Sequence, residues 1–418
     1  MAQLFIDKDR LWQTLMALAE VGAYSDTATG LRGVHRLALT DADADGRRLV
    51  RRWMEEAGLE VRVDRIGNVI GRRRGRDPAA SPVMMGSHID SVPTGGAFDG
   101  ALGVLGALEV IRTLNQAGQD TTRPIEIAFF TDEEGCRFGT DMLGSAVAAG
   151  RIPLDHARSL TDAEGRRVGD ELERIGFAGT HEPRLPPPHA YVELHIEQGP
   201  ILDAAKMDLG VVTGVQAISW QELTIHGRAA HAGTTPMSLR RDAGLAAARI
   251  NVELHRMVAS ARYGSELRAT MGRLEVHPSR VNIVPSHVVC TIDLRNPEDA
   301  AMTRAEQDLA AFLGALATEL GVTIDRRQTA KTPHIAFAAE VQEVIARRME
   351  LKGLRFQRIL SGAGHDAQEL AALCPTAMIF VPGKYEGISH NPRELSTPEA
   401  CALGDQILLE TVLELAEL

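Results

Sequence analysis

The fold that we expect for this chain is decided by residues 82–118, PVMMGSHIDSVPTGGAFDGALGVLGALEVIRTLNQAG. The stretch begins with a short apolar run, which is typical of a buried strand, and continues through a glycine-rich turn. Its last part has helical periodicity, with Leu105, Leu108 and Ile111 on one face, and ends at Gly118. This order of strand, turn and helix predicts one unit of an α/β sheet.

Three further apolar runs have the length of buried strands. They are PIEIAFFT (124–131), YVELHIE (191–197) and TAMIFVP (376–382). Strands separated by helices favour a mostly parallel sheet with helices on both faces. We expect helices at residues 9–20 and 40–57 and a pair of strands in residues 58–75 to precede this part of the α/β domain.

The middle of the chain has a different pattern. SWQELTIHG (219–227) and RVNIVPSHVVCTIDLR (280–295) alternate as in an antiparallel sheet with one solvated face. Helices near residues 239–259 and 300–320 would cover the other face. The sequence therefore predicts a discontinuous domain of residues 1–213 and 330–418, interrupted by an α+β domain of residues 214–329. We expect residues 151–190, which are rich in charge, glycine and proline, to be irregular.

Composition limits the partners and the location of the protein. The 418 residues include 45 basic and 56 acidic ones, a formal net charge of −11, which does not favour nucleic acid or an anionic membrane. No apolar run approaches the roughly 20 residues of a membrane helix, and the N-terminus lacks the apolar region of a signal peptide. The four cysteines form no CxxC pair. We expect a cytoplasmic protein with no nucleic-acid or membrane partner.

Five residues at or near the expected strand ends have side chains that bind metal ions: His88, Asp99, Glu134, His195 and His390. In open α/β sheets, ligands bind beyond the carboxyl ends of the strands. Two carboxylates and three imidazoles are too many ligands for one tetrahedral zinc, but they suit two divalent ions that share a carboxylate. Asp99, on the sharp turn GGAFDG, is the expected bridge.

Two acidic residues beside these ligands are expected to assist them. Because adjacent residues at a strand end point in different directions, one residue of the pair in TDEEG can bind metal while the other takes a proton. We assign Glu134 to the metal and Glu133 to proton transfer. Asp90 could accept the second N–H of the His88 imidazole and so set its tautomer.

Each ligand has an ordinary alternative when it is taken alone. His88 and His390 could be surface histidines, and His195 could be a hydrogen-bonded core residue. Asp99 could cap the helix that follows it, and the acidic turn TDEEG could be solvated. The metal hypothesis rests on the joint position of these residues at the strand ends of one sheet.

Seven motifs resemble those of the zinc-dependent amidohydrolases related to aminoacylase and carboxypeptidase G: GSHIDSVPTGGAFDG, FTDEEG, HIEQGP, GRAAHAGTTPM, RVNIVP, SGAGHDA and ISHNP. They are most similar to the branch of N-carbamoyl-L-amino-acid hydrolase, allantoate amidohydrolase and β-ureidopropionase. The resemblance implies two divalent metal ions per subunit, zinc or alternatively manganese, cobalt or nickel. It also implies an inserted lid domain that joins two subunits into a homodimer. The five ligands and Glu133 occupy the family's positions.

Residues of the inserted domain would contact the substrate. The resemblance implies that His231 corresponds to a lid histidine, often of the partner subunit, that stabilises an oxyanion. It also implies that Asn282 and Arg295 grip the carboxylate or the amide of a small ureido acid, Arg295 through its planar fork. The ordinary alternatives are a surface turn for His231 and a surface ion pair for Arg295, and Arg280 could take the place of Arg295.

Two segments of the first domain carry the other substrate candidates. Gln198 could donate to a substrate carbonyl or could be an ordinary loop amide. The small-residue loop SGAGHDA, including Ser361 and Gly362, could bring backbone N–H groups close to a polar ligand. His365 and Asp366 could simply brace this loop.

The resemblance implies an enzyme that hydrolyses the C–N bond of N-carbamoyl-L-amino acids to the amino acid, carbon dioxide and ammonia. Allantoate and N-carbamoyl-β-alanine are alternative substrates within the branch. A dipeptidase or deacylase would use the same chemistry on another amide. A non-catalytic metal-binding dimer would be expected to lose Glu133 or a ligand, and this chain retains all of them.

Overall fold

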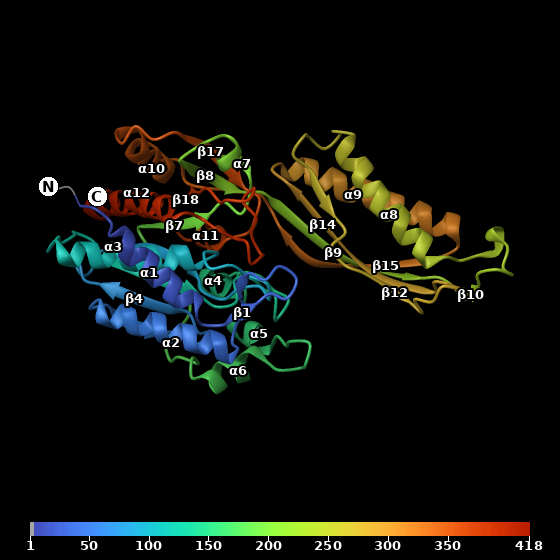
Figure 1. Ribbon diagram of the computed structural model, residues 1–418, viewed down its shortest axis with the longest axis horizontal. Helices are drawn as coiled ribbons and strands as arrows, with labels where there is room; N and C mark the ends of the chain where they lie inside the picture. The colour runs from blue at the N-terminus through green and yellow to red at the C-terminus, as the bar shows by residue number, and fades with distance from the viewer. Residues whose placement is uncertain (1–3) are drawn as a thin grey trace. The chain divides into compact units, whose positions relative to one another are not determined.

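The computed structural model describes residues 4–418, which divide into two compact units (Figure 1). The first unit comprises the described chain up to Gly214 together with Ala336–Leu418, and the second comprises Val215–Ile335. The second unit extends past residue 329 because strand β15 (Thr323–Thr332) continues to pair within its sheet.

A nine-stranded sheet forms the centre of the first unit, in the order β16-β8-β18-β7-β5-β6-β4-β3, with β17 beside β8. The neighbours β18, β7, β5 and β6 are parallel, whereas β8, β4 and β3 add to them in antiparallel fashion. The expected α/β class with a mainly parallel central sheet is confirmed. The strands are β3 (Glu60–Val63), β4 (Val69–Arg73), β5 (Val83–His88), β6 (Ile125–Phe130), β7 (Ala190–Ile196), β8 (Leu209–Val215), β16 (Ile335–Ala336), β17 (Phe356–Ser361) and β18 (Thr376–Val381).

Helices cover both faces of this sheet, as two adjacent residues of β7 demonstrate. Leu194 packs against Gly106 of helix α3 (Ala101–Gln116). Glu193, whose side chain points to the opposite face, accepts a hydrogen bond from a backbone N–H in the first turn of α11 (Asp366–Leu370). Since the strands are covered on both sides, they are apolar and almost entirely buried.

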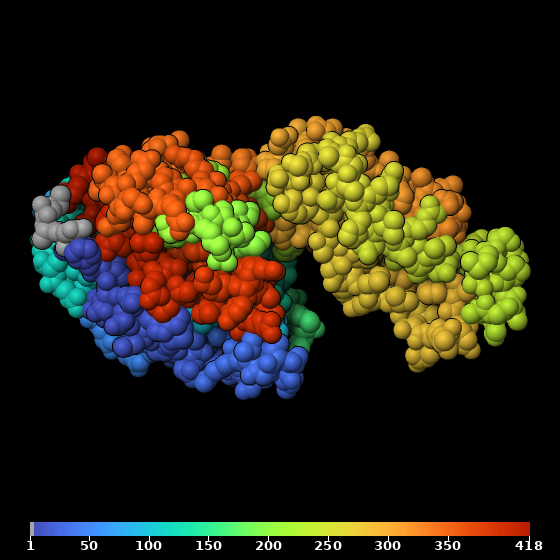
Figure 2. All heavy atoms as spheres, turned by 45° about the horizontal axis from the view of Figure 1, so that its top comes forward, coloured from blue at the N-terminus to red at the C-terminus, as the bar shows by residue number. Residues whose placement is uncertain are grey.

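The N- and C-terminal helices lie side by side in the first unit (Figure 1). In the space-filling view, blue atoms near the N-terminus adjoin red atoms near the C-terminus (Figure 2). Helix α1 (Lys8–Ala19) contacts both α3 and α12 (Pro398–Glu417). The backbone N–H of Ile6 donates to the side chain of Gln406 at 3.0 Å. Other elements of this unit are β1 (Ala23–Ser25), β2 (Arg32–Val34), α2 (Asp41–Glu56), α4 (Leu143–Ala149), α7 (Ile201–Ala204) and α10 (Ala339–Leu351).

The expectation that residues 151–190 are irregular was wrong. They contain the helices α5 (Leu154–Ser159) and α6 (Val168–Ile175). In α6, Val168, Leu172 and Ile175 have helical spacing and are buried. The abundant charges of the segment lie between these positions and obscured the pattern in the sequence.

The second unit has an antiparallel sheet with strand order β11-β14-β9-β15, and β12 pairs with β14. Residues of β14 alternate between buried and half-exposed, and the two long helices pack on the buried side. A short separate pair joins β10 to β13. The elements are β9 (Ala217–His226), β10 (Ala230–His231), the 3-10 turn Met237–Leu239, α8 (Ala243–Ala259), β11 (Arg268–Thr270), β12 (Leu274–His277), β13 (Ile283–Val284), β14 (His287–Asn296) and α9 (Asp299–Leu320).

Across residues 4–418, none of the helices combines the length and the apolar character that spanning a bilayer requires.

Candidate metal centre

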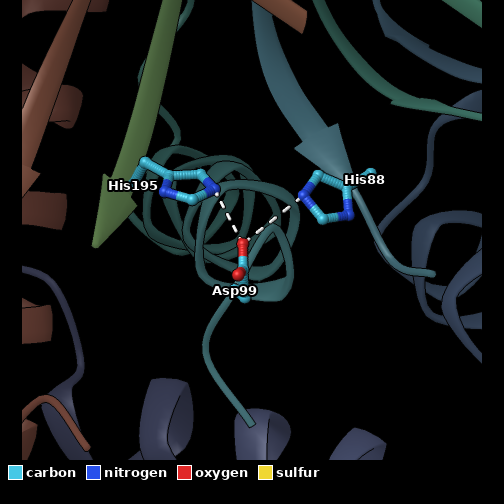
Figure 3. Close-up of side chains that lie close together, drawn as sticks. All are labelled: His88, Asp99 and His195. Carbon is cyan, nitrogen blue, oxygen red and sulfur yellow. Dashed lines mark ion pairs between the residues drawn. The ribbon is translucent and has the colours of Figure 1, made fainter. Parts of the chain in front are cut away.

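The carboxyl ends of β5, β6 and β7 lie next to one another at the same end of the sheet, because these strands are parallel neighbours. His88 is the last residue of β5, and His195 is the last but one of β7. Asp99 lies on the turn that leads into α3. Figure 3 shows the imidazoles of His88 and His195 pointing toward the Asp99 carboxylate from the ends of their strands.

The first candidate metal group consists of His88, Asp99 and His195. The Oδ1 atom of Asp99 lies 3.6 Å from Nε2 of His88 and 3.3 Å from Nε2 of His195. All three side chains are buried. Their possible ligand atoms lie within 4.8 Å of one another, so a single ion could contact all three.

Main-chain carbonyls orient both imidazoles of this group. Nδ1 of His88 lies 3.0 Å from the carbonyl oxygen of Asp90, and Nδ1 of His195 lies 2.9 Å from that of Ile196. A carbonyl can only accept, so each Nδ1 carries a proton, and in the neutral ring the lone pair would then be on Nε2, the nitrogen that faces Asp99. This is the tautomer that binds metal through Nε2.

Asp90 lies at this site, but its carboxylate does not make the contact that the sequence suggested. The carboxylate is 3.8 Å from Nδ1 of His88, whereas the main-chain oxygen of the same residue takes the hydrogen bond. The carboxylate instead accepts the backbone N–H groups of Glu133 and Glu134, each at 3.3 Å. Asp90 therefore ties the end of β5 to the acidic turn that follows β6.

The second candidate metal group consists of Asp99, Glu134 and His390. Nε2 of His390 lies 3.4 Å from Oδ2 of Asp99 and 3.3 Å from Oε2 of Glu134. The two oxygens of Asp99 thus face different groups, Oδ1 the first and Oδ2 the second. Among the described residues, Oε1 of Glu134 is buried and has no hydrogen-bond partner.

The residues present fit a pair of divalent ions that share the Asp99 carboxylate. The donors are imidazole nitrogens and carboxylate oxygens, a set that suits zinc, manganese, cobalt or nickel. The unpartnered oxygen of Glu134 is the kind of buried polar atom that a cation would satisfy. The chain could therefore hold metal here, with Asp99 between two ions.

The structure decides several of the ordinary alternatives. Helix α3 is preceded by Gly100 and receives no side-chain cap, so Asp99 is not its N-cap. His88 and His195 are each about 1% exposed, and their Nε2 atoms face a carboxylate instead of solvent or core. Glu133 is buried, so the acidic turn is not simply solvated. His390 remains half-exposed.

The electrostatics of the site reflect several carboxylates in a small buried space. Burial, together with nearby carboxylates that include Asp366 and Glu134, raises the pKa of Glu133 well above its usual range, although His88 opposes this. For Asp99, hydrogen bonds from the three histidines outweigh burial and hold the pKa well below its usual range. Bound cations would favour the ionised form of every carboxylate here.

Two predicted substrate residues of the first unit make contacts within the site. The side-chain amide of Gln198 donates to Oδ2 of Asp99 at 2.8 Å. The backbone of Gln198 has φ of 55°. Ser361 Oγ lies 2.9 Å from Nε2 of His365, whose ring centroid is 4.5 Å from that of His195. The loop that contains Gly362 is thus adjacent to the first metal group, and His365 braces it.

The predicted substrate residues of the second unit lie on two separate sheets. Arg295 is opposite Ile218 at the start of β9, and its Nη2 is paired with Asp293 at 2.9 Å. His231 pairs with Ile283 on the separate strands β10 and β13, next to Asn282. Its Nδ1 accepts the backbone N–H groups of Gly233 and Thr234 at 3.0 and 3.2 Å, which leaves Nε2 as a donor.

Sequence reasoning missed two acidic residues of the site. Glu193 forms a further candidate metal group with His195 and His365. It lies two residues before His195 on β7, and this spacing is the only signal that could have suggested it. Glu394 is buried and accepts hydrogen bonds from the Asp99 turn, and nothing in its local sequence predicts that contact.

The family of the chain follows from comparison of its sequence with known families. The profile of Peptidase family M20/M25/M40 matches residues 84–414. The chain therefore belongs to Peptidase family M20/M25/M40, and it is a hydrolase that acts on C–N bonds.

Individual relatives are similar over nearly their full length. The chain is 42% identical to N-carbamoyl-L-amino-acid amidohydrolase of Rhizobium meliloti, covering 99% of this chain and 97% of that protein. It is 34% identical to allantoate amidohydrolase of Escherichia coli (strain K12), covering 97% of each. A crystal structure of an amidase of the hydantoinase/carbamoylase family from Burkholderia vietnamiensis superposes with a TM-score of 0.91, at 43% identity and coverage of 99% and 98%. The expected resemblance is confirmed.

Proposed function

We propose that the chain hydrolyses N-carbamoyl-L-amino acids at a centre of two divalent metal ions. The observation that carries the proposal is the Asp99 carboxylate, whose two oxygens face two separate groups of metal-binding side chains. The substrate is supported by 42% identity to an N-carbamoyl-L-amino-acid amidohydrolase, against 34% to an allantoate amidohydrolase.

In this proposal His88, Asp99 and His195 hold one ion, and Asp99, Glu134 and His390 hold the other. Bound there, divalent ions would polarise the scissile carbonyl and lower the pKa of a water molecule. The protein's own contribution is to keep the ligands oriented. The carbonyls of Asp90 and Ile196 do this for the two buried imidazoles.

Glu133 is the proposed general base. It belongs to neither metal group, yet its Oε2 lies 3.5 Å from Nε2 of His88, beside the first of them. Glu133 would take the proton of the attacking water and return it to the nitrogen of the leaving amine. The bond that breaks joins the carbamoyl carbon to the amino acid nitrogen. The amino acid leaves, and the carbamic acid decomposes to carbon dioxide and ammonia.

The remaining residues would position the substrate. The Nε2–H of His231 would donate to the oxyanion, in keeping with the tautomer set by Gly233 and Thr234. Arg295 and Asn282 would bind the carboxylate or the amide of the ureido acid. Gln198 and the backbone of the loop at Ser361 and Gly362 would also contact the substrate.

A homodimer through the second unit belongs to the same proposal. On β14, Arg295 lies eight residues after His287, which is about 27 Å along an extended strand. His287 pairs with His226 at the end of β9. His231 lies beyond the His287 end, so one unit cannot bring both Arg295 and His231 to one small substrate. If both contact it, two copies must contribute. Exposed Leu245 and Val252 on α8 offer an apolar surface for such pairing.

A substrate panel tests the proposed activity. The purified chain, loaded in turn with zinc, manganese, cobalt and nickel, would be given N-carbamoyl-L-amino acids, N-carbamoyl-β-alanine, allantoate, N-acetyl amino acids and dipeptides. Release of ammonia and free amine would be measured for each. We expect the highest kcat/KM with an N-carbamoyl-L-amino acid. Ammonia release from allantoate alone, or amine release from dipeptides alone, would refute this substrate assignment.

A further inference from the structure

Glu394 is a buried carboxylate that joins two loops of the metal centre. Its Oε1 accepts the backbone N–H groups of Phe98 and Asp99 at 3.0 and 3.1 Å. Its Oε2 accepts the hydroxyl of Ser389 at 2.7 Å. Glu394 and Ser389 lie on the loop of His390, nearly 300 residues along the chain from the Asp99 turn.

Ser389 extends this connection to the bridging carboxylate itself. Its Oγ lies 3.0 Å from Oδ2 of Asp99, the oxygen that faces the second metal group. The Thr94 hydroxyl adds a parallel link by donating to the main-chain oxygen of His390 at 3.1 Å. The relative position of Asp99 and His390, which must both contact the second ion, is thus set by hydrogen bonds that converge on the Glu394 segment.

Gly96 leaves room for the Glu394 side chain. A Cβ atom at residue 96 would lie 2.4 Å from the Cβ of Glu394 and 2.5 Å from its carboxyl carbon. Such a contact is too short to be tolerated, so any larger residue at position 96 would force Glu394 away from the Asp99 turn. This supplies a second, independent way to disturb the same contact.

We propose that Glu394 is a positioning residue for the second ion, because it holds Asp99 Oδ2 and His390 at the separation that one ion can bridge. The inference rests on the proposed dinuclear centre and extends it. The first group does not depend on Glu394 in the same way. His88 and His195 are held at strand ends by the carbonyls of Asp90 and Ile196.

His390 depends on its loop because no strand or helix contains it. Its backbone has φ of 56°, and its side chain is 51% exposed. A half-exposed ligand on a loop loses its orientation when the contacts of that loop are removed. We therefore expect loss of Glu394 to release one ion per chain, the one bound by Asp99, Glu134 and His390.

The test measures metal content in addition to activity. The full chain is depleted with a chelator and dialysed to equilibrium against a series of buffered free zinc concentrations, and bound zinc per chain is determined by elemental analysis. Glu394→Met fills the space but accepts no hydrogen bond. Glu394→Gln can still accept both backbone N–H groups and donate to Ser389. We expect Glu394→Met to lower the affinity for one of the two zinc ions by about 10- to 100-fold. Glu394→Gln should bind both ions with affinities close to those of the wild type.

Three further variants make the result specific. Gly96→Ala is expected to lower the affinity for the same ion. Gly314→Ala, on a helix with open space around it, should leave that affinity unchanged. Combining Glu394→Met with His390→Ala should weaken binding no more than His390→Ala alone. Glu109→Met removes a buried carboxylate that is paired with Arg10 and should leave both ions in place, which controls for loss of stability.

The outcomes separate the inference from the proposed function. If the wild-type chain binds fewer than two zinc ions, the dinuclear centre itself is refuted. If the wild type binds two and Glu394→Met also binds two with unchanged affinity, the positioning role of Glu394 is refuted. An equal loss of affinity for both ions, or a Glu394→Gln variant that binds zinc as weakly as Glu394→Met, would also refute the role, because either result indicates a general loss of structure.

Discussion

Asp99 can face both metal groups because the residue that follows it is a glycine. Gly100 has φ of 63°, and a Cβ atom at this position would lie 2.4 Å from Nε2 of His88. Only glycine both adopts this backbone conformation readily and leaves the imidazole nitrogen accessible. The motif GGAFDG thus contains two glycines that leave space for a neighbouring side chain: Gly96 for Glu394 and Gly100 for His88.

Glu133→Gln tests the assignment of the base at the level of one residue. The amide keeps the size of the side chain but cannot accept the proton of the attacking water. We expect kcat to fall by about 100- to 10,000-fold, while zinc content stays at the wild-type value. Steady-state kinetics and elemental analysis of the same preparation check this. Wild-type turnover, or loss of metal together with turnover, would remove Glu133 from this role.

At the level of elements, the acidic turn after β6 is supported by a buried ion-pair network. Arg137 donates to Glu171 at 2.6 Å and to Asp162 at 3.1 Å, and none of the three side chains is more than 8% exposed. Its Nη1 also donates to the main-chain oxygen of Ala38. The network attaches the chain just beyond Glu134 to helix α6 and to the segment before it.

Arg137→Met is expected to lower the free energy of unfolding by at least about 1.5–3 kcal/mol at neutral pH, because it removes charged hydrogen bonds from buried carboxylates. Hydrogen bonds with Arg174 and Arg137 lower the pKa of Glu171, and backbone N–H groups and Arg137 lower that of Asp162 against the effect of burial. Depressed carboxyl pKa values stabilise the fold above their unfolded values, about 4, and this contribution is lost as the pH falls through the folded values.

Denaturant titrations between pH 7 and pH 3 measure this effect. The wild type should lose stability as the pH falls, and Arg137→Met should lose less over the same range, because part of the pH-dependent contribution is already absent. The exposed pair Arg51 and Glu55 provides a matched control, since Arg51→Met should change little. Parallel pH curves for the wild type and Arg137→Met would contradict the expectation.

For the whole molecule, metal removal should lower thermal stability. Without cations, the carboxylates of Asp99, Glu133 and Glu134 lie close together in a buried space, as the raised pKa of Glu133 indicates. A metal that binds only the folded chain adds about 2.7 kcal/mol when its free concentration is 100 times the Kd. Scanning calorimetry with chelator and then with added zinc should show a lower and then a restored Tm. An unchanged Tm would argue against a buried metal centre.

The proposed dimer makes a separate prediction for mixed subunits. Glu133→Gln and His231→Ala should each be inactive, one through its base and the other through its oxyanion donor. If His231 serves the centre of its partner, a mixed dimer contains one complete site. Random mixing after dissociation should then restore about a quarter of wild-type activity. Mixtures that stay inactive while mixed dimers form would show that His231 acts within its own chain.

Much of the fold and of the site could be predicted from sequence, because both depend on local patterns. Apolar runs such as 82–87 and 124–131 have the length of buried strands, and parallel strands bring their carboxyl ends to one edge. His88, Glu134 and His195 lie at or shortly after the ends of such strands, and Asp99 lies on the turn that joins β5 to α3, so their meeting could be expected. The charge-rich segment 151–190 was misjudged because its short apolar pattern is weak.

Only the tertiary structure decided how these residues contact one another. The sequence could not distinguish the carboxylate of Asp90 from its main-chain oxygen as the partner of His88, since both lie two residues away. Nor could it reveal Glu394, because the hydrogen bonds to the Asp99 turn join loops nearly 300 residues apart. Periodicity and strand order follow from neighbouring residues, whereas the orientation of a buried carboxylate follows from packing between segments that meet only in the folded chain.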